Sequence, residues 1–167
     1  NDPRKALAAG MAFVSEDRRG VGLLLQEPID WNIVFTAMQA QGRYVRKMLG
    51  GLVEWRDDEA IAACAREYIQ SLQIKCTGGR QRAIELSGGN QQKVCLAKAF
   101  CVQPDVLFVS EPTRGIDVGA KRLVLDTLRK TNQEHGTTIV MTSSELEELR
   151  SVCDRIAIVD EGKIVGI

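Results

Sequence analysis

A serine and two glycines placed directly before an apolar helical run are the residues of this 167-residue sequence best suited to bind a charged ligand. The stretch Leu86-Ser87-Gly88-Gly89-Asn90-Gln91 precedes the apolar run 94–100, and this spacing predicts a helix that begins after Ser87. The first N–H groups of a helix have no intrahelical acceptor, and glycines let an anion approach them. The residues alone leave two interpretations open: a phosphate-binding helix N-terminus, or an ordinary helix capped by Ser87.

A second candidate site follows an apolar run of strand length. Val106-Leu107-Phe108-Val109 predicts a buried parallel strand, and Ser110 and Glu111 come directly after it. Open α/β sheets bind their ligands at the C-terminal ends of strands, where Glu111 would be placed to act on water. The alternative is a glutamate that only caps a turn.

Two further loops place polar residues after predicted strands. The run 11–15 predicts a short buried strand, and it leads into a charged loop that begins at Glu16. A glutamate can ligate a hard cation through oxygen, and a solvated connection is the alternative interpretation of this loop. The β-branched run 137–142 predicts another strand, and Ser144-Glu145-Leu146-Glu147 has the spacing of a capping box, with Ser144 as the N-cap.

Three blocks of the sequence, in order, resemble the ATP-binding-cassette ATPases. Residues 86–92 (LSGGNQQ) are similar to that family's signature motif, in the form typical of bacterial sugar importers. Residues 104–120 (PDVLFVSEPTRGIDVGA) and 136–162 resemble the next two blocks. The resemblance covers nearly the whole chain, which looks like the C-terminal cassette of a ribose-, xylose- or galactose-type importer ATPase without its Walker A portion.

The resemblance implies an α/β fold of the P-loop NTPase type, with a mostly parallel sheet, helices on both of its faces and an α-helical signature subdomain. Residues 1–30 would form a core part with a Q-loop-like segment. Residues 31–102 would form the helical subdomain, and residues 103–167 would carry the Walker B, D-loop and H-loop parts of the core.

The resemblance also assigns roles to the candidate residues. Leu86 to Gln91 (Leu86, Ser87, Gly88, Gly89, Asn90 and Gln91) would contact ATP held by a partner cassette. Gly115, Ile116 and Asp117 would form the D-loop, which crosses the interface between cassettes. Glu111 would be the catalytic residue that polarises the attacking water.

Three positions depart from the family's common pattern. Ser110 stands where the Walker B aspartate orders Mg²⁺ through water, and a neutral hydroxyl is a weaker partner for that ion. Glu16 stands at the Q-loop glutamine. Ser144 stands at the switch histidine, whose charge and proton chemistry a serine lacks, so the N-cap role is sufficient to explain it. We therefore expect no well-formed metal site in this half.

The sequence contains no G-x-x-x-x-G-K-[ST] loop, the element that holds nucleotide phosphates, and it starts at Asn1. We expect it to be a piece of a longer polypeptide that uses ATP and Mg²⁺, and we expect this piece alone to bind MgATP weakly or not at all. The missing wall of the ATP site would come from the N-terminal cassette of the same parent chain or from a second cassette. Transmembrane permease subunits and, indirectly, a sugar-binding protein are the other partners that the resemblance implies.

Composition excludes some classes of protein. Basic and acidic residues both number 22, which gives no electrostatic reason to expect nucleic acid as a partner. No apolar run approaches the roughly 20 residues that span a bilayer, so we expect a cytoplasmic location, with any membrane attachment through a partner. The resemblance implies that permease subunits hold the protein at the inner face of the membrane. The five cysteines form no C-x-x-C pair, which predicts reduced, mostly buried thiols rather than disulfide or metal sites.

Three functions stay open at this point. The first is an ATPase subunit that energises carbohydrate import. The second is a catalytically silent module that only completes or regulates a partner's site, which Ser110, Ser144 and the absent phosphate loop favour for this half. The third, a cassette protein of DNA repair or translation, is disfavoured by the neutral charge and by the form of the signature.

The remaining elements are predicted from local signals. Asp30 could cap a helix that carries Trp31 and Ile33, and the carboxylates at 57–59 predict the start of another helix. His135-Gly136 predicts the end of a helix, where the histidine needs no catalytic role. Asp160-Glu161-Gly162 predicts the turn of a C-terminal hairpin.

Overall fold

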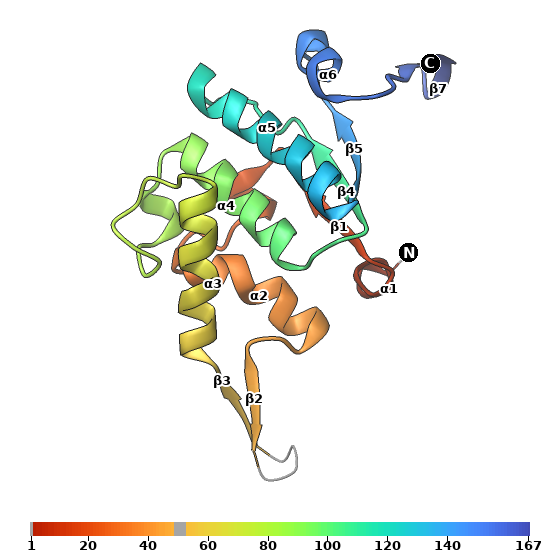
Figure 1. Cartoon of the computed structure of the whole chain (residues 1–167). Coiled ribbons are helices and arrows are strands. Elements are labelled where there is room, and N and C mark those ends of the chain that lie inside the picture. The colour runs from red at the N-terminus through yellow and green to blue at the C-terminus, as the bar shows by residue number, and fades with distance from the viewer. Residues whose placement is uncertain (1, 49–52) are drawn as a thin grey trace.

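A three-stranded parallel sheet forms the centre of the computed structural model, which describes residues 2–48 and 53–167 (Figure 1). The sheet joins β1 (Met11–Val14), β4 (Val106–Ser110) and β5 (Thr138–Thr142) in the order β1-β4-β5. Both pairings are parallel. The expected α/β class is therefore confirmed, and β4 is the central strand of this sheet.

One face of the sheet is buried and the other is open. On the buried face, Ala12, Leu107 and Val109 are at most 7% exposed. Helix α4 (Gly88–Cys101) contacts β1 and helix α5 (Val118–His135) contacts β5. On the other face, the cross-strand row of Phe13, Phe108 and Val140 is between 39% and 62% exposed. The expectation of helices on both faces is thus wrong for the described residues, and β1 is buried on one side only.

The helices α2 (Ile29–Gln41), α3 (Asp58–Ser71) and α4 form a bundle beside the sheet. Ile33, Val94 and Leu96 are fully buried within it. The antiparallel strands β2 (Val45–Met48) and β3 (Val53–Arg56) extend away from the bundle as a narrow ribbon (Figure 1). Gly50-Gly51, a glycine pair that predicts a break between elements, lies outside the described residues.

Short elements complete the chain. They are helix α1 (Pro3–Ala8), a π-helical turn at Arg18–Gly22, a 3₁₀ turn at Ala83–Glu85, helix α6 (Leu146–Val152), and strands β6 (Ile158–Asp160) and β7 (Lys163–Gly166). The C-terminal hairpin is as predicted: Glu161 (φ 45°) and Gly162 (φ 75°) both have the positive φ of a type I′ turn. None of the helices described is long and apolar enough to cross a bilayer.

The first residues of three helices can be compared with the capping residues in the sequence. Helix α3 begins where the carboxylates at 57–59 predicted, and Asp57 caps it by accepting from the backbone N–H of Ala60 (3.1 Å). Asp117 caps α5 in the same way, by accepting from the backbone N–H of Ala120 (3.0 Å). The capping prediction for Asp30 is wrong. Helix α2 begins at Ile29, so Asp30 lies in its first turn, where it is only 3% exposed and forms an ion pair with Arg80 at 3.3 Å.

A candidate anion-binding helix terminus and strand-end cluster

The N-terminus of α4 keeps free hydrogen-bond donors. Ser87 holds the N-cap position, but its hydroxyl caps no backbone N–H group. The first helical bond recorded runs from the N–H of Gln91 to the carbonyl of Ser87 (2.9 Å). Within residues 2–48 and 53–167, no acceptor is recorded for the N–H groups of Gly88, Gly89 and Asn90, and no acidic residue lies in the first turn. These are the properties of an anion-binding helix terminus.

Side chains around this terminus hold it in place. The Asn90 side-chain amide donates to the Ser87 hydroxyl (2.9 Å) and accepts from the backbone N–H of Lys75 (2.9 Å). Helix α4 thus begins after Ser87 as predicted, but the serine hydroxyl accepts from a side chain and caps no backbone N–H group. Leu86 (6% exposed) and Gln91 (1% exposed) are buried, and Gln91 donates to the carbonyl of Ala83 (3.0 Å). Of the six signature residues, these two anchor the motif from inside.

The two glycines lie against the loop 115–117. A Cβ atom on Gly88 would come within 3.6 Å of the Gly115 carbonyl oxygen, and one on Gly89 would come within 3.7 Å of Ile116. Gly115 itself has φ +66°, a conformation that favours glycine. The structure therefore joins the predicted signature and D-loop residues into one surface, with the start of α5 at Asp117 beside it.

Arg18 belongs to this surface, although no role is predicted for it from the sequence. Its Nη1 donates to the carbonyl of Arg114 (2.7 Å), and its Nη2 lies 3.5 Å from the positions that a Cβ would take on Gly88 and on Gly115. The loop that presents it is closed by Asp17, whose carboxylate accepts from the Gly20 N–H (2.8 Å). A guanidinium beside free helix amides strengthens the attraction for an anion. The basic pair in Glu16-Asp17-Arg18-Arg19 was the available signal.

A second cluster forms where β4 and β5 end. Glu111 has φ +46°, uncommon for a residue with a side chain, and its N–H donates to the carbonyl of Thr142 (2.9 Å). The Ser144 hydroxyl donates to the Glu111 carboxylate (3.2 Å), and the Thr142 hydroxyl donates to that of Ser110 (3.4 Å). The strand ends thus bring together the predicted residues Ser110, Glu111 and Ser144.

The predicted N-cap role of Ser144 is wrong. Helix α6 begins at Leu146, and its N-cap residue Glu145 makes no side-chain cap. The neighbouring serine takes the local role, because the Ser143 hydroxyl accepts from the Glu145 N–H (3.0 Å). Ser144 is left free to contact Glu111, a partner 33 positions away in the sequence.

A buried carboxylate connects the two loops that carry this cluster. Glu148 is 6% exposed and accepts hydrogen bonds from the hydroxyls of Thr113 (2.6 and 2.7 Å) and Ser143 (3.1 Å), and it pairs with Lys121 at 3.2 Å. Burial alone would raise the pKa of Glu148, but the bonds from Thr113, Lys121 and Ser143 outweigh it and lower the pKa. The carboxylate of Glu148 is therefore favoured over the protonated acid. It links Thr113, two residues after Glu111, to Ser143, the residue before Ser144.

Glu16 does not join Ser110 and Glu111 through any recorded contact. Its carboxylate, 47% exposed, pairs with Arg114 at 2.8 Å. The described residues contain no group of three or more histidines, cysteines, aspartates or glutamates that could hold a metal ion. The strand-end cluster offers one carboxylate and three hydroxyls, which is a poor set for Mg²⁺ without phosphate or water ligands.

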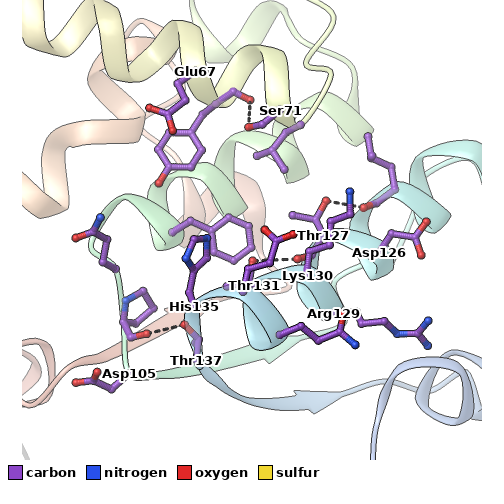
Figure 2. A pocket seen from close by; sticks show the side chains of 18 residues that line it. Glu67, Ser71, Asp105, Asp126, Thr127, Arg129, Lys130, Thr131, His135 and Thr137 are labelled. Atoms are coloured by element: carbon purple, nitrogen blue, oxygen red, sulfur yellow. Dashed lines mark hydrogen bonds between the residues drawn. The ribbon is translucent and has the colours of Figure 1, made fainter.

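A cavity of about 860 Å³ lies elsewhere, between α3, the end of α4 and α5. Figure 2 shows its charged and polar rim, which includes Glu67, Asp126, Lys130 and His135. None of the candidate residues described above lines it. The arrangement suited to an anion is therefore the exposed surface at the start of α4, and not this cavity.

The fold is an α/β fold of the P-loop NTPase type. Its defining features are the parallel sheet, the polar cluster at the ends of β4 and β5, and helix α4, which begins with two glycines. A sequence model of the family described as "ABC transporter" matches residues 7–114, and the chain belongs to this family. The dimeric structure of MJ0796, a bacterial ABC transporter cassette, superposes with a TM-score of 0.80 at 20% identity, over 99% of this chain and 66% of that one. That likeness concerns the fold.

Curated relatives are more similar in sequence. The ribose import ATP-binding protein RbsA of Caldanaerobacter subterraneus subsp. tengcongensis is 37% identical over 99% of this chain and 32% of its own length. The D-allose import ATP-binding protein AlsA of Escherichia coli is 41% identical over 99% of this chain and 31% of its own length. The chain thus spans about a third of the length of the curated relatives that it matches.

Proposed function

We propose that this chain is part of an ATP-hydrolysing subunit that energises carbohydrate import. In this proposal the start of α4 and the loop 115–117 bind the phosphates of an ATP molecule whose other contacts come from a neighbouring cassette. The observation that carries it is the row of unpaired N–H groups at Gly88, Gly89 and Asn90 beside the guanidinium of Arg18. The sugar-import names of the relatives support the choice of cargo.

The residues fit the phosphate part of ATP. Helix amides and a guanidinium are donors that stabilise negative charge, and no carboxylate of the first turn opposes them. The sequence contains no G-x-x-x-x-G-K-[ST] loop, so the main phosphate cradle of the site would come from residues outside these 167. That cradle would belong to the N-terminal cassette of the same polypeptide or to a second cassette.

The fit to Mg²⁺ is poorer. Glu111 is the carboxylate of the strand-end cluster, and Ser110 adds only a hydroxyl. We therefore assign no metal-dependent step to this half. Glu111 would act as a base that orients water, and Ser144, as its hydrogen-bond donor, would orient the carboxylate.

The proposal includes partners that the chain would need. Permease subunits would hold the protein at the cytoplasmic face of the membrane and would transmit the cassette motion, and a sugar-binding protein would deliver the cargo. The sequence offers no net charge that would favour nucleic acid instead.

A second candidate function is a catalytically silent module that completes a partner's ATP site. Ser110 favours it, because its hydroxyl contacts Thr142 and adds no negative charge beside Glu111. The two functions share the anion-binding start of α4 and differ only in whether Glu111 takes part in hydrolysis.

Variants in the full polypeptide that carries this sequence separate the two functions. Gly89→Asp places a carboxylate at the proposed phosphate surface, where the added Cβ meets only ordinary contacts at 3.7 Å, so we expect ATPase turnover to fall at least tenfold. Ser87→Ala, which removes one hydroxyl, should cause a smaller loss. Gly166→Asp is the matched control, because its nearest neighbour would be 3.9 Å away in the C-terminal hairpin.

Glu111→Gln completes the experiment. If Gly89→Asp and Glu111→Gln both lower turnover while Gly166→Asp does not, the half is an active part of the ATPase. A loss with Gly89→Asp alone would favour the silent module. Unchanged turnover in both Ser87→Ala and Gly89→Asp would contradict the proposed role of α4 altogether.

A further inference from the structure

Two cysteine side chains meet between α3 and the end of α4, away from the candidate ATP surface. The Sγ atoms of Cys64 and Cys101 are 3.8 Å apart, although 37 positions separate them in the sequence. The Tyr44 hydroxyl lies against both, donating to Cys64 Sγ at 3.2 Å and standing 3.4 Å from Cys101 Sγ. A small rotation about the side-chain bonds could close a sulfur pair at this separation into a disulfide.

The guanidinium of Arg43 is hydrogen-bonded to Tyr44. Arg43 Nη2 donates to the Tyr44 hydroxyl (2.9 Å), while its Nη1 donates to the backbone carbonyl of Cys101 (2.6 Å). The hydroxyl therefore accepts from a cation and donates to Cys64 Sγ. This chain of bonds favours negative charge on that sulfur, which is the form of cysteine that reacts.

The two sulfurs differ in accessibility and acidity. Cys64 is partly exposed, whereas Cys101 is 1% exposed. Hydrogen bonds from Cys101 and Tyr44 outweigh burial and lower the pKa of Cys64 to about 7, while the bond to Cys64 and burial raise the pKa of Cys101. The charged groups nearby are Arg43, which favours the Cys64 thiolate, and Glu67, which opposes it. An accessible thiolate beside a buried thiol is the arrangement of an attacking and a resolving cysteine.

We propose that Cys64 and Cys101 form a reversible disulfide by exchange with a low-molecular-weight disulfide such as oxidised glutathione. In the first step the Cys64 thiolate attacks one glutathione sulfur, a mixed disulfide forms, and one glutathione thiolate leaves. In the second step Cys101 loses its proton and attacks Cys64 Sγ, and the second glutathione thiolate leaves. The protein gives up two electrons and two protons, and oxidised glutathione is reduced to two molecules of glutathione.

The bond would join α3 to the C-terminal end of α4, the helix whose N-terminal end carries Gly88 and Gly89. It would close a loop that includes the whole connection between the two helices. Because cross-links of this kind restrict the unfolded chain, the oxidised protein should unfold at a higher temperature than the reduced protein.

Two of the other cysteines, Cys95 and Cys153, provide internal controls. Cys95 is buried and burial raises its pKa to about 12, and burial also raises the pKa of Cys153. No sulfur–sulfur contact other than that of Cys64 and Cys101 is recorded among the described residues. Trypsin cleavage places these cysteines in different peptides. Cys64 lies in the peptide 57–66, Cys101 in 99–114 and Cys153 in 151–155.

The test treats the full polypeptide with oxidised glutathione at pH 7.5, blocks free thiols with an alkylating reagent, and maps tryptic peptides by mass spectrometry. We expect peptides 57–66 and 99–114 to be recovered joined by a disulfide, with 151–155 alkylated, and reduction to restore both thiols. Alkylated 57–66 and 99–114 after prolonged exposure to the oxidant would overturn the proposal.

Two conservative variants test the order of attack. Cys101→Ser should stop the reaction at a glutathione adduct on Cys64, and Cys64→Ser should leave Cys101 alkylated and free of adduct. An adduct on Cys101 in Cys64→Ser, formed as fast as the wild-type disulfide, would contradict the assignment of Cys64 as the attacking thiol. The readout does not depend on ATP, so its outcome is independent of the proposed function.

Discussion

Glu148→Gln is the substitution whose effect the structure defines most sharply. The carboxylate is 6% exposed and satisfies donors from Thr113, Ser143 and Lys121. The isosteric amide keeps one oxygen, which can accept from Thr113 and from either Lys121 or Ser143, because those two donors bond to different oxygens of Glu148. Its NH₂ group cannot accept the bond from the other donor. The charge attraction to Lys121 at 3.2 Å is lost as well.

The magnitude follows from the bonds that cannot be remade. Hydrogen bonds to charged groups are worth about 1.5–3 kcal/mol each, and some are recovered by rearrangement, so we expect a net loss of about 2–3 kcal/mol in local stability. Since 1.4 kcal/mol is tenfold, amide hydrogen exchange in the segments 106–114 and 138–152 should accelerate by about 30- to 140-fold where exchange reports local opening.

Hydrogen exchange with peptide-level mass spectrometry is the assay, and Glu147→Gln is the matched control. The Glu147 side chain is 88% exposed and only approaches Arg150 at 3.5 Å, so its loss should change exchange by about twofold or less. Equal exchange in the two variants would refute the assignment of Glu148 as the link between the loops.

The pH dependence has a definite sign. The pKa of Glu148 is lowered in the folded chain, so its stabilising effect is complete above the unfolded value of about 4.3 and is lost as the pH falls through the lower, folded value. The difference between wild type and Glu148→Gln should therefore be constant near neutral pH and shrink in acid.

Three further substitutions test other parts of the structure. Ser110→Asp adds a carboxylate beside Glu111, so the Mg²⁺ concentration that gives half-maximal ATPase activity should fall if this half hydrolyses ATP. The double variant Ser110→Asp/Glu111→Gln should lose that activity. Superimposable Mg²⁺ curves for the wild type and both variants would show that Ser110 never limited the site. Gly136→Ala places a side chain on a residue with φ +69°, where no neighbour lies within 4 Å, so the strain of the backbone alone should destabilise the end of α5 by about 1 kcal/mol. Amide hydrogen exchange at the end of α5 should therefore be faster. Gly166→Ala should leave amide exchange unchanged. Tyr44→Phe removes one hydrogen bond to Cys64 worth about 1 kcal/mol, which should raise the pKa of that thiol, so alkylation of Cys64 at pH 7 should slow about threefold. An unchanged rate would contradict the role of the hydroxyl.

Local signals in the sequence are sufficient for the three strands of the parallel sheet, for the C-terminal hairpin and for the helix starts at Asp57 and Ser87. The ribbon of β2 and β3 is not predicted. Val106 to Val109 could be recognised as a strand because its apolar run is bounded by Pro104 and Pro112. The capping aspartates Asp57 and Asp117 bond to N–H groups three residues away, so nothing distant can compete with them.

Three features that the sequence does not predict share one physical cause, which is a partner supplied from far along the chain. Ser144 has the spacing of a cap, but the Glu111 carboxylate, brought to it by the pairing of β4 with β5, takes its hydroxyl. Arg18 was missed because its contact with the Arg114 carbonyl spans 96 positions. The meeting of Cys64 and Cys101 was equally invisible to spacing rules, which detect only neighbours in sequence.

The segment 110–117 carries residues of both clusters, and the structure fixes it between them. Thr113 is held by Glu148 from the side of α6, and the next residue, Arg114, is held from the side of β1 by Glu16 and Arg18. Arg18 donates to a neutral carbonyl, which is a weaker acceptor than a phosphate oxygen. An anion at the start of α4 would therefore compete with Arg114 for the same guanidinium. Because Arg114 lies three residues after Glu111 and its N–H donates to the Glu111 carbonyl at 3.2 Å, that competition would act on the turn that sets the glutamate's position.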